Sequence, residues 1–248
     1  MQTVEDIRRF KIENYDFRPL EITFRMTSPI CLTFPFIFFD GIVAHLMNRY
    51  LDPEGYRALP SKKVVKRVGE VSLPIKKYFF SGEEYIYHAS VSIFDQDQAY
   101  VTTIYKRFCE KYLDFSRVKR KRIDRSRGFF KDYMIKLVYV PARKVTFYAY
   151  GDPGALEVLL QGLPGLGKKT AIGFGMIKDF TIKEIDNDYS IVKDGVAMRS
   201  IPVEAVRWTS EVVLMAYRAP YWAKEHVKPC VPPFARCELW KGNGKSTS

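Results

Sequence analysis

A glycine-rich loop lies between a predicted helix and a predicted strand, and this order limits the folds that the chain can adopt. The segment "GDPGALEVLLQG" has Asp152 as an N-cap, Pro153 at the first helical position and Gly162 where the helix would end. After the loop, "FGMIKDFTIKEI" interleaves apolar and charged residues, which predicts a strand. The P-loop of nucleotide-binding proteins joins a strand to a helix, so the order here is the reverse.

The loop "GLPGLGKKTAIGFG" also departs from a P-loop in its residues. Lys168 fits the pattern, but Lys169 stands where the hydroxyl that ligates Mg²⁺ should be, and Thr170 comes one residue too late. We therefore exclude ATP and predict contact with RNA phosphates, because glycines allow close backbone approach and lysines supply charge. A simple turn would account for Gly162 and Gly175 alone. The residues predicted for this contact are Gly165, Gly167, Lys168, Lys169, Gly173 and Gly175.

The remaining periodic segments predict an α+β fold. A strand at 20–29 is followed by a helix at 40–51, with Asp40 as its N-cap. Stripped of insertions, the order is strand, helix, strand, strand, helix, strand, which is the ferredoxin-like (RRM-like) βαββαβ arrangement. Such a core has two helices on one face of an antiparallel sheet and leaves the other face free for a ligand. The other strands are predicted at 83–94, 133–140, 144–151 and 174–185.

Two additions to this core are predicted. Residues 1–187 form the ferredoxin-like domain, which carries a basic insertion at about 95–132. Residues 188–248 form an extension that packs on the core and ends in flexible residues. We expect a helix near 203–216 and then an irregular, proline-rich segment.

The charge of the chain favours a polyanionic partner, with nucleic acid first and a membrane surface second. The net charge is +12 and 15% of the residues are aromatic. The insertion concentrates this charge in "SRVKRKRIDRSRGFFK", where Phe129 and Phe130 could stack on bases, although core packing is the better expectation for both rings. The predicted RNA-binding residues of the insertion are Lys119, Arg120, Lys121, Arg122, Arg125, Arg127 and Lys131.

Candidate catalytic and metal-binding residues are few. His45 on the first helix has the pKa range of a general base for RNA cleavage, with Tyr50 as a possible helper. Its apolar neighbours favour a packing or surface histidine instead. His226, Cys230 and Cys237 have suitable ligand chemistry for zinc but no fourth ligand nearby, so we predict neither a metal nor a cofactor.

The sequence indicates a cytoplasmic protein without a membrane segment. The longest apolar stretch, 29–39, is too short to span a bilayer, and the first residues lack the pattern of a cleavable signal. The four cysteines have no paired short spacings, so we interpret them as reduced thiols.

The loop and its surroundings resemble the RAMP superfamily, the repeat-associated proteins of CRISPR systems. That family has a glycine-rich loop between the last helix and last strand of a ferredoxin-like core, and Gly173, Phe174 and Gly175 match the end of its motif. The segments "SPICLTFPFIFFDGIVAHL", "KVTFYAYGDPGALEVLLQGLPGLGKKTAIGFGMI", "MRSIPVE" and "YRAPYW" are more narrowly similar to the RAMP subunit of type IV effector complexes. Together they span most of residues 20–222.

This resemblance implies a non-catalytic subunit that caps the 5′ handle of the guide RNA (crRNA), with Phe174 in the RNA-binding loop. It also implies contacts with the backbone and large-subunit equivalents of the complex, and with target DNA near its flanking motif. Repeat-processing RAMP nucleases commonly place a catalytic histidine on the first helix, where His45 stands. The alternative function is therefore a metal-independent endoribonuclease that processes precursor guide RNA.

Overall fold

The computed structural model describes residues 15–51, 72–96, 98–109, 111, 116 and 124–240. Within these ranges the protein is α+β and mostly β, with α-helices α2 (Phe39–Leu51) and α4 (Pro153–Gln161). None of the helices in the described ranges is long and apolar enough to cross a membrane.

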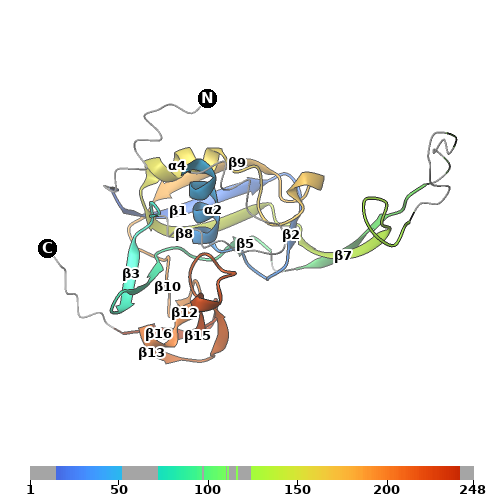
Figure 1. Cartoon of the computed structure of the whole chain (residues 1–248). Helices are drawn as coiled ribbons and strands as arrows, with labels where there is room; N and C mark the ends of the chain where they lie inside the picture. The colour runs from blue at the N-terminus through green and yellow to red at the C-terminus, as the bar shows by residue number, and fades with distance from the viewer. Residues whose placement is uncertain are drawn as a thin grey trace.

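A four-stranded antiparallel sheet forms the body of the molecule (Figure 1). Its strand order is β5 (Ile93–Phe94), β8 (Lys144–Gly151), β1 (Arg18–Met26) and β9 (Ile177–Glu184). Along the chain the elements of this body follow one another as β1, α2, β5, β8, α4 and β9.

One face of this sheet packs against both helices. Alternate residues of β1, Leu20, Ile22 and Phe24, are fully buried in one cluster with apolar residues of α2 and α4, as expected for a strand whose side chains alternate between faces. The predicted caps of α4 are confirmed, because the Asp152 carboxylate accepts a hydrogen bond of 2.8 Å from the Ala155 amide and Gly162 ends the helix.

A long hairpin, here called the arm, consists of β6 (Tyr100–Lys106) and β7 (Tyr133–Val140) and projects from the body (Figure 1). At its base β7 also pairs with β2 (Ile30–Leu32), which gives a sheet of order β2-β7-β6. The insertion into the core therefore reaches beyond the predicted end at 132 and includes β7. The reason is that β7 pairs with β6 and β2, and not with the core strands β8 and β1.

The extension is a second, smaller β unit with its own buried cluster, which includes Ile86, Ile201, Tyr217, Cys230 and Val231. Two strands from the first half of the chain, β3 and β4, pair with each other beside it (Figure 1). The strands of this region are β3 (Lys77–Ser81), β4 (Glu84–Tyr87), β10 (Val192–Lys193), β11 (Val196–Ala197), β12 (Ile201–Pro202), β13 (Val206–Thr209), β14 (Val213–Ala216), β15 (Val227–Val231) and β16 (Cys237–Leu239).

The helix predicted near 203–216 is wrong. Only the short 3₁₀ turn Val203–Ala205 is helical there, and β13 and β14 follow it. These strands pair with β16 and β15, which come later in the chain, so tertiary pairing overrides the local helical pattern. The proline-rich segment, predicted to be irregular, contributes β15. The predicted flexible end, residues 241–248, lies outside the described residues.

Arg199 ties the extension to the body, and Asp40 is its partner. The guanidinium is fully buried and lies 3.3 Å from the Asp40 carboxylate, which also accepts a 2.7 Å hydrogen bond from the Tyr221 hydroxyl. Burial and then the negative charge of Asp40 raise the pKa of Tyr221 well above its ordinary value, so the hydroxyl stays a donor. The predicted N-cap role of Asp40 is wrong, because the helix already begins at Phe39 and the carboxylate holds Arg199.

Candidate nucleic-acid interface

The glycine-rich loop runs from α4 to β9, which confirms the predicted order of helix, loop and strand. Close packing explains several of its glycines. A Cβ at Gly167 would stand 2.5 Å from the Cys31 carbonyl oxygen, and one at Gly175 would stand 1.8 Å from the Leu166 carbonyl oxygen. Gly167, Gly173 and Gly175 also have positive φ angles, which favour glycine. The loop thus has a conformation that few other residues would permit.

The backbone amides of the loop are largely used within the protein. Gly175 donates to the Pro29 carbonyl at 2.7 Å, Lys168 donates to the Cys31 carbonyl at 2.8 Å, and Gly173 donates to Thr170 at 3.0 Å. The bonds to Pro29 and Cys31 fasten the loop to β2 and to the residue before it, and the bond to Thr170 closes a turn within the loop. The amides of Gly173 and Gly175 are therefore engaged, and the loop offers an anion mainly its lysine side chains.

Lys168 and Lys169 are exposed next to one another. Lys169 has a left-handed backbone with φ of 63°, so the chain turns sharply at this residue. Burial raises the pKa of the neighbouring Cys31 thiol, and the charges of Lys169 and Lys168 partly offset that rise. The loop consequently presents two adjacent positive charges on a fixed backbone, close to the base of the arm.

Aromatic rings continue from the loop onto one face of the arm. The ring of Phe174 lies 6.2 Å from that of Tyr139 on β7, and Tyr139 stacks on Tyr100 of β6 at 5.8 Å. These two tyrosines are direct cross-strand partners. Sequence reasoning missed Tyr100 and Tyr139, although the alternating pattern of β7 could have placed Tyr139 on one face. We call Lys168, Lys169, Phe174, Tyr139 and Tyr100 the loop–arm track.

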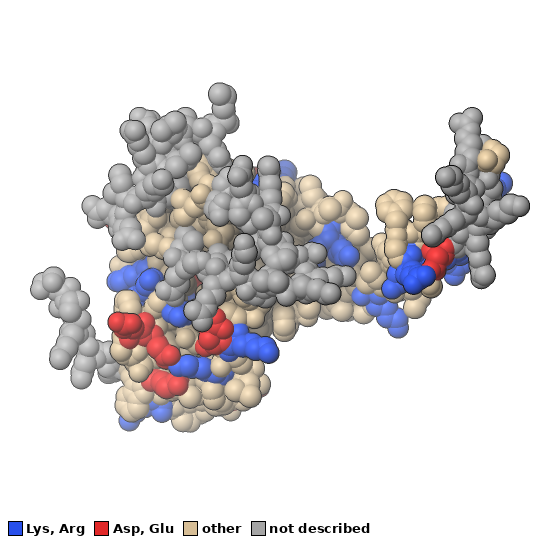
Figure 2. Space-filling model, viewed as in Figure 1, with Lys and Arg blue, Asp and Glu red and all other residues tan. Residues whose placement is uncertain are grey.

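The outer end of the arm carries further cations, some of them paired with acids. Arg125 donates to the Asp132 carboxylate at 2.8 Å, and Arg127 donates to Asp124 at 2.6 Å. A hydrogen bond from the Phe108 amide and then the one from Arg125 lower the pKa of Asp132. Figure 2 shows acidic atoms next to basic atoms on the arm. Lys131 is exposed, and the predicted contacts Lys119, Arg120, Lys121 and Arg122 lie outside the described residues.

The two phenylalanines of the arm differ in exposure. Phe130 packs against Phe108 at 4.8 Å between ring centres, whereas Phe129 is 82% exposed with the Lys106 ammonium 5.2 Å from its ring. The expectation of core packing is therefore wrong for both rings, because Phe130 is still 37% exposed and neither ring belongs to a buried cluster of the described residues.

The sequence profile of the family described as CRISPR type IV associated protein Csf3 matches residues 18–233. The chain belongs to the Csf3 family. The match begins at β1 and extends through the arm, the loop and most of the extension, which confirms the predicted resemblance to a type IV CRISPR protein.

Among solved structures, this Csf3-family chain is similar to one in the "Cryo-EM structure of the Type III-B Cmr-beta bound to cognate target RNA". The TM-score is 0.31 and the identity is 7%, with 73% of this chain and 65% of that chain covered. The chain thus spans about 65% of the length of that relative. Comparison with curated proteins gives no match.

The Csf3-family chain does not bring His45 and Tyr50 together on one face of α2. They are five positions apart on the helix, which corresponds to about 140° around its axis. His45 is exposed, whereas Tyr50 packs partly against the body's core. Partial desolvation and then the charge of Arg49 lower the pKa of His45.

The sulfur and imidazole groups considered for zinc lie in the extension of this Csf3-family chain. Cys230 and Cys237 are buried in its apolar cluster, and burial raises the pKa of Cys230 to about 12. His226 contacts the Arg218 carbonyl at 3.2 Å. No cluster of three or more metal-ligating side chains occurs within the described ranges. The two cysteines therefore act in packing.

Proposed function

We propose that this Csf3-family protein is the RNA-binding subunit of a type IV CRISPR ribonucleoprotein effector, where it caps the 5′ handle of the guide RNA. The observation that carries the proposal is the loop–arm track, in which two exposed lysines on a fixed loop lead directly to stacked aromatic rings. Cations that bind phosphates beside rings that stack on bases are the features required for single-stranded RNA.

The family match supports this proposal, because the family is associated with type IV CRISPR systems. The strand order β9-β1-β8-β5, with both helices packed on one face, further supports a ferredoxin-like core. In this proposal the other partners are the backbone and large-subunit equivalents of the complex. The protein also helps to position target DNA near its flanking motif.

The double variant Lys168→Glu/Lys169→Glu is expected to bind a synthetic RNA carrying the 5′ handle about tenfold more weakly or worse, because two phosphate contacts become repulsive. The slope of log affinity against log salt should fall by about 1.4, since each contact with a single strand contributes about 0.7. Fluorescence anisotropy over a salt series measures both quantities.

A matched control has the same change in net charge elsewhere. The variant Arg207→Glu/Lys224→Glu alters two exposed residues of the extension, and its affinity should stay close to that of the parent protein. Equal losses in the two double variants would mean that only net charge matters and would rule out the loop as the RNA site. Phe174→Ala and Tyr139→Ala test the stacking half of the track in the same assay.

We further propose that the protein is not a nuclease. Incubation of the purified protein with precursor repeat RNA in EDTA is expected to leave the RNA intact. The reason is that His45 and Tyr50 lie on different faces of α2 and so cannot act on the same phosphate. Gel electrophoresis of the products is the measurement. Specific cleavage that His45→Ala abolishes would contradict this proposal and establish the endoribonuclease instead.

A further inference from the structure

The face of the arm opposite the loop–arm track has a different chemistry. Side chains alternate along a strand, so Val101 and Tyr105 of β6 share this face with Met134 and Val138 of β7. These four side chains are between 46% and 64% exposed. We call this row, in which Thr103 and Lys136 lie between the two apolar pairs, the stripe. Exposed apolar side chains gathered on one face in this way mark an interaction site.

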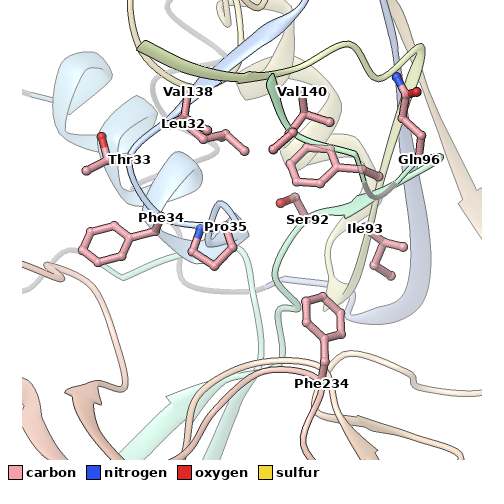
Figure 3. Close-up of a pocket in the computed structure, with 12 residues that line it drawn as sticks. Leu32, Thr33, Phe34, Pro35, Ser92, Ile93, Gln96, Val138, Val140 and Phe234 are labelled. Atoms are coloured by element: carbon pink, nitrogen blue, oxygen red, sulfur yellow. The ribbon is translucent and has the colours of Figure 1, made fainter. Parts of the chain in front are cut away.

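The stripe leads into a hollow of about 420 Å³ at the base of the arm. Val138 belongs to both, because it lines the hollow with Val140 and with Leu32 of β2. Figure 3 shows these residues on one side of the opening, with Phe34 and Pro35 beside them and Phe234 reaching in from the extension. The body, the arm and the extension therefore all contribute to one surface.

Two aromatic rings at the hollow face solvent. Phe34 is 68% exposed and Phe234 is 50% exposed. Phe234 has a left-handed backbone with φ of 72°, which is costly for a bulky residue. Hydrogen bonds from its own amide to Ala197, at 2.7 Å, and from the Ala235 amide to Pro232, at 3.2 Å, hold the turn in this conformation. A strained turn that displays an apolar ring to solvent is typical of a binding surface.

Charge indicates the kind of partner. The chain has a net charge of +12, yet none of the described residues that line the hollow is charged, so this part of the lining does not attract a polyanion. The stripe carries one exposed cation, Lys136, which shares the face of Val138 and Met134. An apolar protein segment with a carboxylate opposite Lys136 matches both features, whereas an RNA phosphate would pair with Lys136 but leave the uncharged aliphatic lining of the hollow, such as Leu32 and Val140, without a partner.

We propose that Phe34, Val101, Tyr105, Met134, Val138 and Phe234 form a docking surface for an apolar, carboxylate-bearing segment of a neighbouring protein subunit. This inference rests on the proposed function, since it takes the partner from the same ribonucleoprotein complex. The arm then has two roles on its two faces: one face binds RNA and the other binds protein.

The test uses the full-length protein and each of the other protein subunits of the complex, purified separately and mixed without RNA. Phe234→Gly is the sharpest variant, because glycine removes the ring and also relieves the left-handed strain. We expect binding of one subunit to weaken about 30-fold for Phe34→Ser/Phe234→Gly, as for an aromatic hot spot, measured by calorimetry. The thermal midpoint should stay unchanged or rise for Phe234→Gly, which a purely structural role would not produce.

Lys136→Glu is expected to weaken the same binding, most strongly at low salt, because an attractive pair becomes repulsive. The matched control is Leu214→Ser, which removes an exposed apolar side chain of β14 outside the surface. Its affinity for the subunit should equal that of the parent protein.

Three outcomes would overturn the proposal. One is unchanged binding of every subunit by the Phe34→Ser/Phe234→Gly variant. Another is a loss of handle-RNA affinity in that variant with subunit binding intact, which would assign the surface to RNA. The third is self-association of the parent protein in sedimentation equilibrium that the variant abolishes, which would assign it to a second copy of the chain. Failure of the RNA proposal is seen separately, in the Lys168→Glu/Lys169→Glu variant.

Discussion

The Arg199→Met variant is expected to lose roughly 3–5 kcal/mol of its free energy of unfolding, which is the usual cost of removing one partner of a buried ion pair. Arg199 is fully buried and donates hydrogen bonds to the Asp40 carboxylate and to the carbonyl of Tyr217, the latter at 2.6 Å. It also donates to the carbonyls of Tyr87 and Ala89. Methionine fills similar space but removes one donor from the carboxylate and from each of these carbonyls, and it leaves the buried carboxylate without its cation. Equilibrium unfolding in urea measures the loss.

The control for this prediction is Arg207→Met. Arg207 lies 3.4 Å from Glu238, but both side chains are more than half exposed, so the pair contributes only about 0–1 kcal/mol. Adding Asp40→Asn to Arg199→Met should recover part of the lost stability, because the uncompensated buried charge disappears. A loss in Arg199→Met as small as that in Arg207→Met would show that Arg199 does not join the extension to the body energetically.

The Gly175→Ala variant is expected to lose roughly 2–5 kcal/mol and to bind the handle RNA more weakly. Its Cβ would stand 1.8 Å from the Leu166 carbonyl oxygen, and its φ is 63°. The loop must therefore move, and Lys168 and Lys169 move with it. Urea unfolding and fluorescence anisotropy report the two effects on the same preparation.

The Gly173→Ala variant shows how much of the stability loss comes from backbone strain alone, without a steric clash of the new Cβ. Gly173 also has a positive φ, of 95°, but a Cβ there meets nothing within 4 Å. Only the strain remains, so the expected loss is about 1–2 kcal/mol, with little change in RNA affinity. Equal effects in the two variants would mean that the close approach of Gly175 to Leu166 does not determine the loop conformation.

The parts of the fold that the sequence predicts well are those with local causes. α4 has a capping aspartate, an early proline and a terminal glycine, each of which acts within a few residues, and the helix forms where these signals predict it. The position of the glycine-rich loop after this helix follows from the same signals.

The incorrect predictions have distant causes. β13 and β14 lie where a helix was expected because their partners, β16 and β15, come later in the chain. Asp40 has the local context of an N-cap, but its carboxylate accepts a hydrogen bond from Arg199, which is 159 positions later in the chain. The residues near position 40 in the sequence do not indicate this pairing.

The candidate site divides in the same way. The exposed lysine pair is evident in the sequence because its charge and its glycine context are adjacent. Tyr100 and Tyr139 belong to the site only through cross-strand pairing and the contact with Phe174. The apolar surface around Phe234 depends on the extension folding back to the base of the arm, which a linear pattern does not reveal.

The pairing of Asp40 with Arg199 also affects how the protein is made. The two residues are 159 positions apart, so a ribosome that adds about 5–20 residues per second needs roughly 8–32 s to pass from one to the other. The body is itself complete only once β9, which ends at Glu184, has been made, and Asp40 then still lacks its cation until Arg199 follows. A polypeptide that terminates early would keep this defect and be open to proteases. The extension thereby makes stability of the body conditional on nearly complete synthesis.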